Sequence, residues 1–186
     1  RQMCIRDSVI GCASGSDSLL LALMAINIQP GEEVILPSYT FFATASAVTR
    51  LGGVPIFADI DPSTFLIDPD DLRRRITSRT RAIIPVHLFG QTVDMDAILP
   101  IAEQAGVPII EDAAQSVLST WHGKCSGGLG DIGCFSFYPT KNLGGSLGPS
   151  RQSFRMKQVI RALSIFSLCF FGFDGPGGGF GGFLLG

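Results

Sequence analysis

Five short apolar segments lie in the middle of the chain, each after a turn or a polar stretch. They are residues 34–37, 54–58, 82–86, 107–110 and 133–137. Each segment is rich in β-branched or aromatic residues, which is typical of parallel strands that are buried on both faces. The pattern therefore predicts a mostly parallel sheet.

Helical patterns occupy the intervals between these strands. They cover residues 18–26, 42–51, 69–76 and 94–105. The third helix begins with Pro69 and two aspartates, the acidic first turn that a helix dipole favours. The fourth has apolar residues at helical spacing and ends at Gly106. Strands that alternate with helices predict an α/β fold with helices on both faces of the sheet.

The alternation of strands and helices stops near the end of the chain. After Gly148 no further strand–helix unit is recognisable, and residues 172–186 are mostly glycine and phenylalanine. Glycine-rich segments do not readily form regular elements. We expect residues 9–148 to form the domain, and residues 1–8 and 149–186 to be ends that do not belong to it.

Two features of this end resemble functional motifs. Residues 177–182 match G-x-G-x-x-G. A dinucleotide site needs a strand before this motif and a helix after it, so we interpret the match as chance. The apolar run at residues 162–173 is shorter than the roughly 20 residues of a membrane span. We therefore expect no membrane partner.

Composition narrows the possible functions. The chain has 186 residues, of which 46% are hydrophobic, so a packed core is expected. A net charge of −2 gives no basic field for nucleic acid. The five cysteines form no C-x-x-C pair and predict reduced thiols in the cytoplasm. His87 and His122 show no metal-ligand spacing, so we interpret them as core or surface histidines.

We expect catalytic and binding residues at strand ends, because ligands of open α/β sheets bind beyond the carboxyl ends of the strands. The first candidate is the segment of residues 14–18, directly before a helix. The amides of Ser16 and Asp17 could hold a phosphate at the helix N-terminus. Taken alone, the segment favours ordinary helix capping.

The second candidate is residues 109–115, where an apolar strand runs into two acids. Asp112 could pair with a protonated pyridine nitrogen, and Gln115 could donate to a ring hydroxylate. The alternative is that Asp112 caps the next helix. Glu111 should point to the opposite side, because neighbouring residues of a strand alternate.

The third and fourth candidates are a lysine and an aromatic residue. Lys141 follows an aromatic strand, and partial burial with a nearby cation would lower its pKa enough to attack an aldehyde. Ser136 and Thr140 offer hydroxyls for a phosphate. Phe41 could stack on an aromatic cofactor. In isolation, a solvated lysine and a core phenylalanine are the simpler interpretations.

These segments occur together in one order that is similar to a known family. Residues 14–23, 37–45, 83–91, 110–115 and 130–144 resemble the DegT/DnrJ/StrS sugar aminotransferases. The resemblance runs from about Val9 to Gly145, and the motifs are highly specific as a set. Residues 1–8 and those after Gly145 do not match. We therefore also consider that this chain is an inactive fragment.

The resemblance implies a type I aminotransferase fold, here as the truncated large domain of residues 9–148. It implies pyridoxal 5'-phosphate (PLP) as cofactor, in a cytoplasmic homodimer that serves polysaccharide biosynthesis. The reaction would move an amino group from an amino acid, with glutamate expected, to a nucleotide-linked keto sugar through a Schiff base on Lys141. Other positions carried over are Asp112 for the pyridinium nitrogen, Gln115 for the ring hydroxyl, Phe41 for stacking, and Ser16, Asp17 and Ser136 for the phosphate.

Three alternatives were weighed against this function. A few family members are dehydratases with histidine in place of the lysine, and Lys141 favours amino transfer. A non-catalytic or regulatory protein on the same fold is disfavoured by the joint presence of Asp112, Gln115 and Lys141. A nicotinamide dehydrogenase is disfavoured because no glycine fingerprint follows the first strand.

Overall fold

The computed structural model describes residues 8–142 and 167–171. In chain order, the elements are β1 (Ser8–Cys12), α1 (Gly15–Ala25), β2 (Glu33–Pro37), α2 (Phe42–Arg50), β3 (Val54–Ala58), α3 (Pro69–Arg75), β4 (Thr80–Ile83), the 3-10 turn η1 (Leu88–Gly90), α4 (Met95–Ala105), β5 (Ile110–Asp112), β6 (Thr120–Trp121), β7 (Lys124–Cys125), β8 (Ile132–Ser136) and β9 (Ser167–Phe171).

All described strands except β6 and β7 form one continuous order, β3-β2-β4-β5-β8-β9-β1, and β6 pairs antiparallel with β7 as a separate hairpin. Two hydrogen-bonded sheets, β3-β2-β4 and β5-β8-β9-β1, are linked by parallel bridges from Ile83 to Ile109 and from Val86 to Asp112. Strand β2 is parallel to β3 and β4, and β5 is parallel to β8. Strand β9 is antiparallel to both of its neighbours. The predicted mostly parallel sheet is confirmed.

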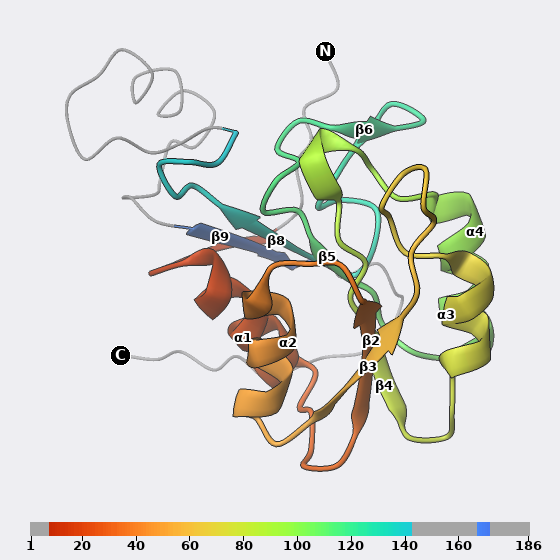
Figure 1. Cartoon of the computed structure of the whole chain (residues 1–186). Coiled ribbons are helices and arrows are strands. Elements are labelled where there is room, and N and C mark those ends of the chain that lie inside the picture. Colours follow the sequence, from red (N-terminus) through yellow and green to blue (C-terminus); the bar gives the residue numbers. More distant parts are fainter. Residues whose placement is uncertain (1–7, 143–166, 172–186) are drawn as a thin grey trace.

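Helices cover both faces of this sheet, with α1 and α2 on one side and α3 and α4 on the other (Figure 1). The alternation of side chains along β2 shows why. Val34 and Leu36 lie in a buried cluster with residues of α1 and α2. Ile35 lies in a second cluster with residues of α3 and α4. The continuous apolar runs in the sequence thus reflect strands that are buried on both faces.

The predicted elements are found with shifted ends. The helix expected to begin at residue 18 begins at Gly15, because the Ser14 hydroxyl caps its first turn by accepting from the Asp17 amide at 3.1 Å. The strand expected at residues 82–86 ends at Ile83, and Pro85, which lacks an N–H, follows soon after. Strands β1 and β9 and the β6–β7 hairpin are not among the predicted elements.

Strand β9 comes from residues 149–186, the segment we expect not to belong to the domain. It lies between β1 and β8 and pairs along its whole length with both. The glycine motif at residues 177–182 and most of the apolar run at residues 162–173 lie outside the described residues. Within the described ranges, no helix is long and apolar enough to cross a membrane.

Candidate active site

Asp112 lies at the carboxyl end of β5 and is almost completely buried. One carboxylate oxygen, Oδ2, accepts a hydrogen bond from the Thr44 hydroxyl at 2.9 Å. The other, Oδ1, accepts one from the Ala114 amide at 3.2 Å. Asp112 takes no part in the ion pairs formed within the described ranges. The site therefore holds a buried carboxylate that is oriented by hydrogen-bond donors and suited to a cationic partner.

The electrostatics of Asp112 follow from its burial. Burial raises the pKa of its carboxyl group, because desolvation disfavours the charged form. The hydrogen bonds from Thr44 and Ala114, and the nearby charge of Lys141, oppose this rise without cancelling it. A cation bound against Asp112 would favour the ionised form further.

Glu111 points to the other side of β5, as the alternation of strand residues predicts. Its buried carboxylate accepts from the amides of Gly127, Leu129 and Gly130 at 2.6–2.7 Å. It also pairs with the Nε2 atom of His87 at 2.8 Å. Glu111 thereby fastens the loop before β8 to β5.

The ring of His87 is buried in this network, which confirms the interpretation as a core histidine. Its Nδ1 atom accepts from the Val93 amide at 3.2 Å, so the ring proton lies on Nε2 and is donated to Glu111. The backbone amide of His87 donates to the Asp112 carbonyl at 3.0 Å. The network on the Glu111 side is therefore joined to the strand that carries Asp112.

Burial also raises the pKa of Glu111, but the hydrogen bonds from His87 and the loop amides outweigh it, and the net pKa lies below the ordinary value. The two neighbouring acids thus differ in character. Glu111 is an ionised anchor of the fold, whereas Asp112 is held at the end of a strand with fewer donors.

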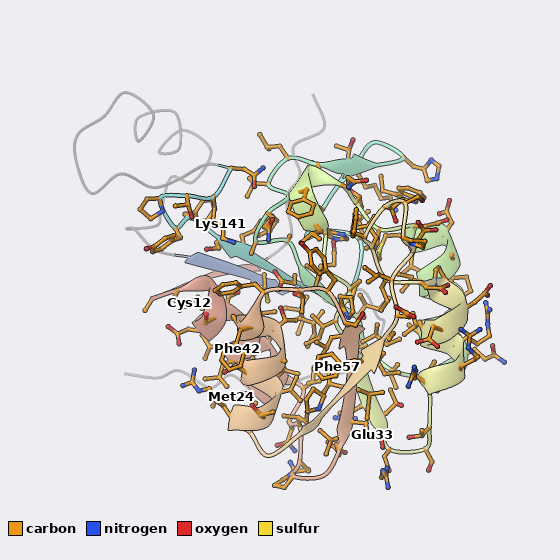
Figure 2. All side chains as sticks on the ribbon, viewed as in Figure 1. Cys12, Met24, Glu33, Phe42, Phe57 and Lys141 are labelled. Carbon is orange, nitrogen blue, oxygen red and sulfur yellow. The ribbon has the colours of Figure 1, made fainter. Side chains whose placement is uncertain are left out.

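Lys141 and Phe41 lie together at the edge of the sheet where the parallel strands end. Figure 2 shows Lys141 at the opposite side of the molecule from Glu33, the first residue of β2. The Lys141 amide donates to the Tyr138 carbonyl at 2.8 Å, which closes a turn after β8. The Nζ atom lies 5.5 Å from the centroid of the Phe41 ring, a cation–π distance.

Phe41 precedes helix α2 and is 66% exposed. The simpler interpretation of this residue, a core phenylalanine, is therefore wrong. Its ring stays accessible because it lies in the connection between β2 and α2, outside the apolar layers that those two elements bury. An exposed aromatic face beside a lysine and a buried carboxylate suits a flat, charged ligand.

The first turn of α1 contacts the end of β8. A Cβ atom placed on Gly15 would lie 2.8 Å from the Cβ atom of Ser136, so this approach requires glycine. Ser14 both accepts from the Asp17 amide and donates to the Asp17 carboxylate. This geometry confirms the capping interpretation of the segment. Ser16 and Asp17 remain half-buried at the helix N-terminus, close to buried Ser136.

The structure therefore brings the sequence-predicted residues into two groups. Asp112, Lys141 and Phe41 form one, and the first turn of α1 with Ser136 forms the other. Gln115 is half-buried, three residues beyond Asp112. Thr44 is not among the predicted site residues, although it lies inside one of the motifs that carry the family resemblance.

The chain is similar to known aminotransferases. The sequence pattern of the DegT/DnrJ/EryC1/StrS aminotransferase family matches residues 2–148. The expectation that the family match excludes residues 2–8 and 146–148 is therefore wrong. A "Pleiotropic regulatory protein" of Geobacillus stearothermophilus is 53% identical over 135 residues, which cover 73% of this chain and 36% of that protein. A "UDP-N-acetyl-3-dehydro-alpha-D-glucosamine 3-aminotranferase" of Acidithiobacillus ferrooxidans is 50% identical, with coverage of 73% and 37%.

A solved structure shows the same fold. The putative sugar aminotransferase Spr1654 from Streptococcus pneumoniae, in its PLP form, superposes with a TM-score of 0.77 at 26% identity. The alignment covers 91% of this chain and 42% of that one. The chain spans little more than a third of the length of the curated relatives reported above.

Proposed function

We propose that this chain, which belongs to the DegT/DnrJ/EryC1/StrS aminotransferase family, is the cofactor-binding part of a PLP-dependent sugar aminotransferase. One observation carries the proposal. A buried carboxylate at a strand end, Asp112, lies within electrostatic range of Lys141, whose Nζ atom lies 5.5 Å from the exposed ring of Phe41. The PLP form of the pneumococcal structure supports the choice of cofactor.

The residues of the site fit this cofactor. Asp112 is a buried anion that forms no ion pair with another described residue, and a pyridinium nitrogen would supply the missing cation. The first turn of α1 contains Ser16 and Asp17. It contacts Ser136 at Gly15, where a side chain would collide with Ser136. We assign the phosphate to this place, where helix amides and hydroxyls are at hand.

Each side chain then has a role. When bound, PLP supplies an electron sink for the amino donor. Asp112 would hold a proton on the ring nitrogen, Phe41 would cover one face of the ring, and Gln115 would donate to the ring oxygen. Lys141 would hold the cofactor covalently and would accept a proton from the α-carbon of the amino donor. A positioned acid–base group of this kind contributes about 10²–10⁴-fold to the rate.

We propose glutamate as the amino donor and a nucleotide-linked keto sugar as the acceptor. The printed name of the Acidithiobacillus relative, a UDP-linked dehydro sugar aminotransferase, supports the acceptor class. In the test, glutamate and a panel of such sugars are incubated with a full-length enzyme, meaning a protein of the relatives' length that contains this segment. Release of 2-oxoglutarate is expected. Release only with simple 2-oxo acids would assign the enzyme to another aminotransferase group.

We further propose a cytoplasmic homodimer. Tyr39, Phe65 and Phe89 are exposed, and the ring centroid of Tyr39 lies 5.7 Å from that of Phe65 and 6.5 Å from that of Phe89. Phe65 and Phe89 have positive φ angles of 61° and 54°, a costly conformation for a bulky residue. Exposed aromatic clusters are typical of subunit interfaces. The full-length enzyme should sediment as a dimer; an active monomer at micromolar concentration would contradict this proposal.

A regulatory function is the second candidate, because a relative with 53% identity is named a pleiotropic regulatory protein. Both candidates can bind PLP, so binding alone does not separate them. Turnover does. An enzyme should release many equivalents of 2-oxoglutarate per site, whereas a regulatory protein should bind PLP without transferring an amino group to any acceptor in the panel.

A further inference from the structure

Thr44 is a buried polar residue to which the proposed function gives no role. It lies in the first turn of α2 and is fully buried. Its hydroxyl donates to the Asp112 carboxylate at 2.9 Å, across 68 positions of the chain. A second hydroxyl, that of Thr40, lies 2.8 Å from the Thr44 hydroxyl.

The direction of this hydrogen-bond chain follows from the chemistry of its members. An ionised carboxylate can only accept, so the single hydroxyl proton of Thr44 goes to Asp112. The oxygen of Thr44 must then accept from Thr40. The chain therefore runs from Thr40 through Thr44 to Asp112, and each step orients the next.

We propose that Thr44 is a positioning residue that fixes the Asp112 carboxylate toward the ring nitrogen of the cofactor. The inference rests on the proposed function and deepens it. Ala114, the other donor to the carboxylate, belongs to the same turn as Asp112, so its amide cannot tie that turn to another element. Thr44 is the donor that comes from a different layer of the fold.

The same helical turn also carries the stacking residue. The Thr44 amide donates to the Phe41 carbonyl at 3.1 Å. The first turn of α2 thus holds two proposed cofactor contacts. It binds Asp112, proposed for the ring nitrogen, and it is hydrogen-bonded to Phe41, proposed for the ring face. A shift of this turn would move both contacts together.

Other titratable groups near Asp112 come from two further elements. His87 follows β4, and its amide donates to the Asp112 carbonyl. Lys141 follows β8, and its charge favours the ionised form of Asp112. Glu111 is the adjacent acid, and its carboxylate is bound on the other side of β5. A hydroxyl differs from these groups because it orients the carboxylate without adding charge.

The test compares variants of the full-length enzyme without any amino donor. Thr44→Val keeps the shape and removes the donor, Thr44→Ser restores the donor, and Thr49→Val alters an exposed threonine of the same helix. Two quantities are measured: the dissociation constant of PLP, and the pH at which bound PLP changes its absorbance. Urea unfolding of the cofactor-free proteins shows whether each variant folds.

T44V should bind PLP roughly tenfold more weakly, because one hydrogen bond to a charged group is lost. Its absorbance transition should move to higher pH. Without the Thr44 hydrogen bond, Asp112 holds the proton on the ring nitrogen less firmly, so the ring carries less positive charge. The nitrogen that links PLP to Lys141 then keeps its own proton up to a higher pH. T44S should restore both values, and T49V should change neither. Thr44→Cys, which donates only weakly, replaces T44V under the same criteria if T44V does not fold.

A folded T44V or T44C with parental PLP affinity and a parental absorbance transition would overturn the role of Thr44. That result leaves the proposed function intact, because the parent protein still binds PLP. A parent protein that binds no PLP would instead overturn the proposed function together with this inference.

Discussion

At the scale of single residues, the site depends on two neighbouring acids in opposite situations. Glu111 has four hydrogen-bond donors and a lowered pKa, whereas burial raises the pKa of Asp112. A residue with a raised pKa binds its proton more tightly in the folded state, so its contribution to stability declines as the pH rises. Under the proposed function, the charge of Asp112 would serve cofactor binding at a cost to the stability of the cofactor-free fold.

The substitution Asp112→Asn should expose this cost. Relative to the parent, the cofactor-free variant should become more stable as the pH rises from below the ordinary aspartate pKa to neutrality, because only the parent must keep a buried charge. Urea unfolding at several pH values measures the difference. A difference that is constant with pH would show that Asp112 has no raised pKa. The loaded D112N enzyme should still attach PLP to Lys141 but turn over slowly.

At the scale of elements, the loop of residues 126–131 is held in place by a side chain of β5. Glu111 accepts from three amides of this loop, and the loop leads directly into β8, which ends at Ser136. Because the pKa of Glu111 is lowered, its contribution is fully present above the ordinary glutamate pKa and is lost as the pH falls through the lowered value.

Replacement of this anchor should loosen β8 and the residues after it. Glu111→Gln turns one acceptor oxygen into a donor that faces backbone N–H groups. The variant should lose about 3 kcal/mol of unfolding free energy at neutral pH, a typical cost of breaking a buried charged contact. Glu103→Gln, on the exposed face of α4, is the matched control and should stay within about 0.5 kcal/mol of the parent. Equal stabilities of the two variants in urea would contradict the anchoring role.

The elements themselves were largely predictable, whereas their contacts were not. Val34, Ile35 and Leu36 indicate a strand buried on both faces, because apolar residues follow one another with no polar residue between them. Nothing local to Asp112 indicates that its donor is Thr44, 68 positions away. The resemblance to a family singled out Lys141 and Phe41, which the structure brings within 5.5 Å of each other, but it did not single out Thr44.

At the scale of the whole molecule, β9 lies inside the sheet although it comes from a segment that we expect not to belong to the domain. This strand lies in residues 149–186, beyond the part that matches the family. Without it, the facing edges of β1 and β8 would lack their hydrogen-bond partners. We retain the prediction that residues 149–186 do not belong to the native domain, and β9 makes this prediction testable.

Limited proteolysis and amide exchange of the 186-residue chain address this point. In limited proteolysis, residues 149–186 should be cleaved first. In amide exchange, the amides of residues 167–171 should exchange about tenfold faster than those of β8, because pairing with the sheet adds little to their protection. Protection of residues 167–171 equal to that of the central strands would show that this segment is part of the fold.

The most direct test of the proposed function is the covalent attachment of PLP. The full-length enzyme is incubated with PLP, reduced with borohydride and digested, and the modified lysine is identified by mass spectrometry. The parent should carry the adduct on Lys141, Lys141→Ala should carry none and lose turnover, and Lys124→Ala, in the hairpin strand β7, should match the parent. A Lys141→Ala protein that retains a borohydride-reducible adduct would contradict the assignment.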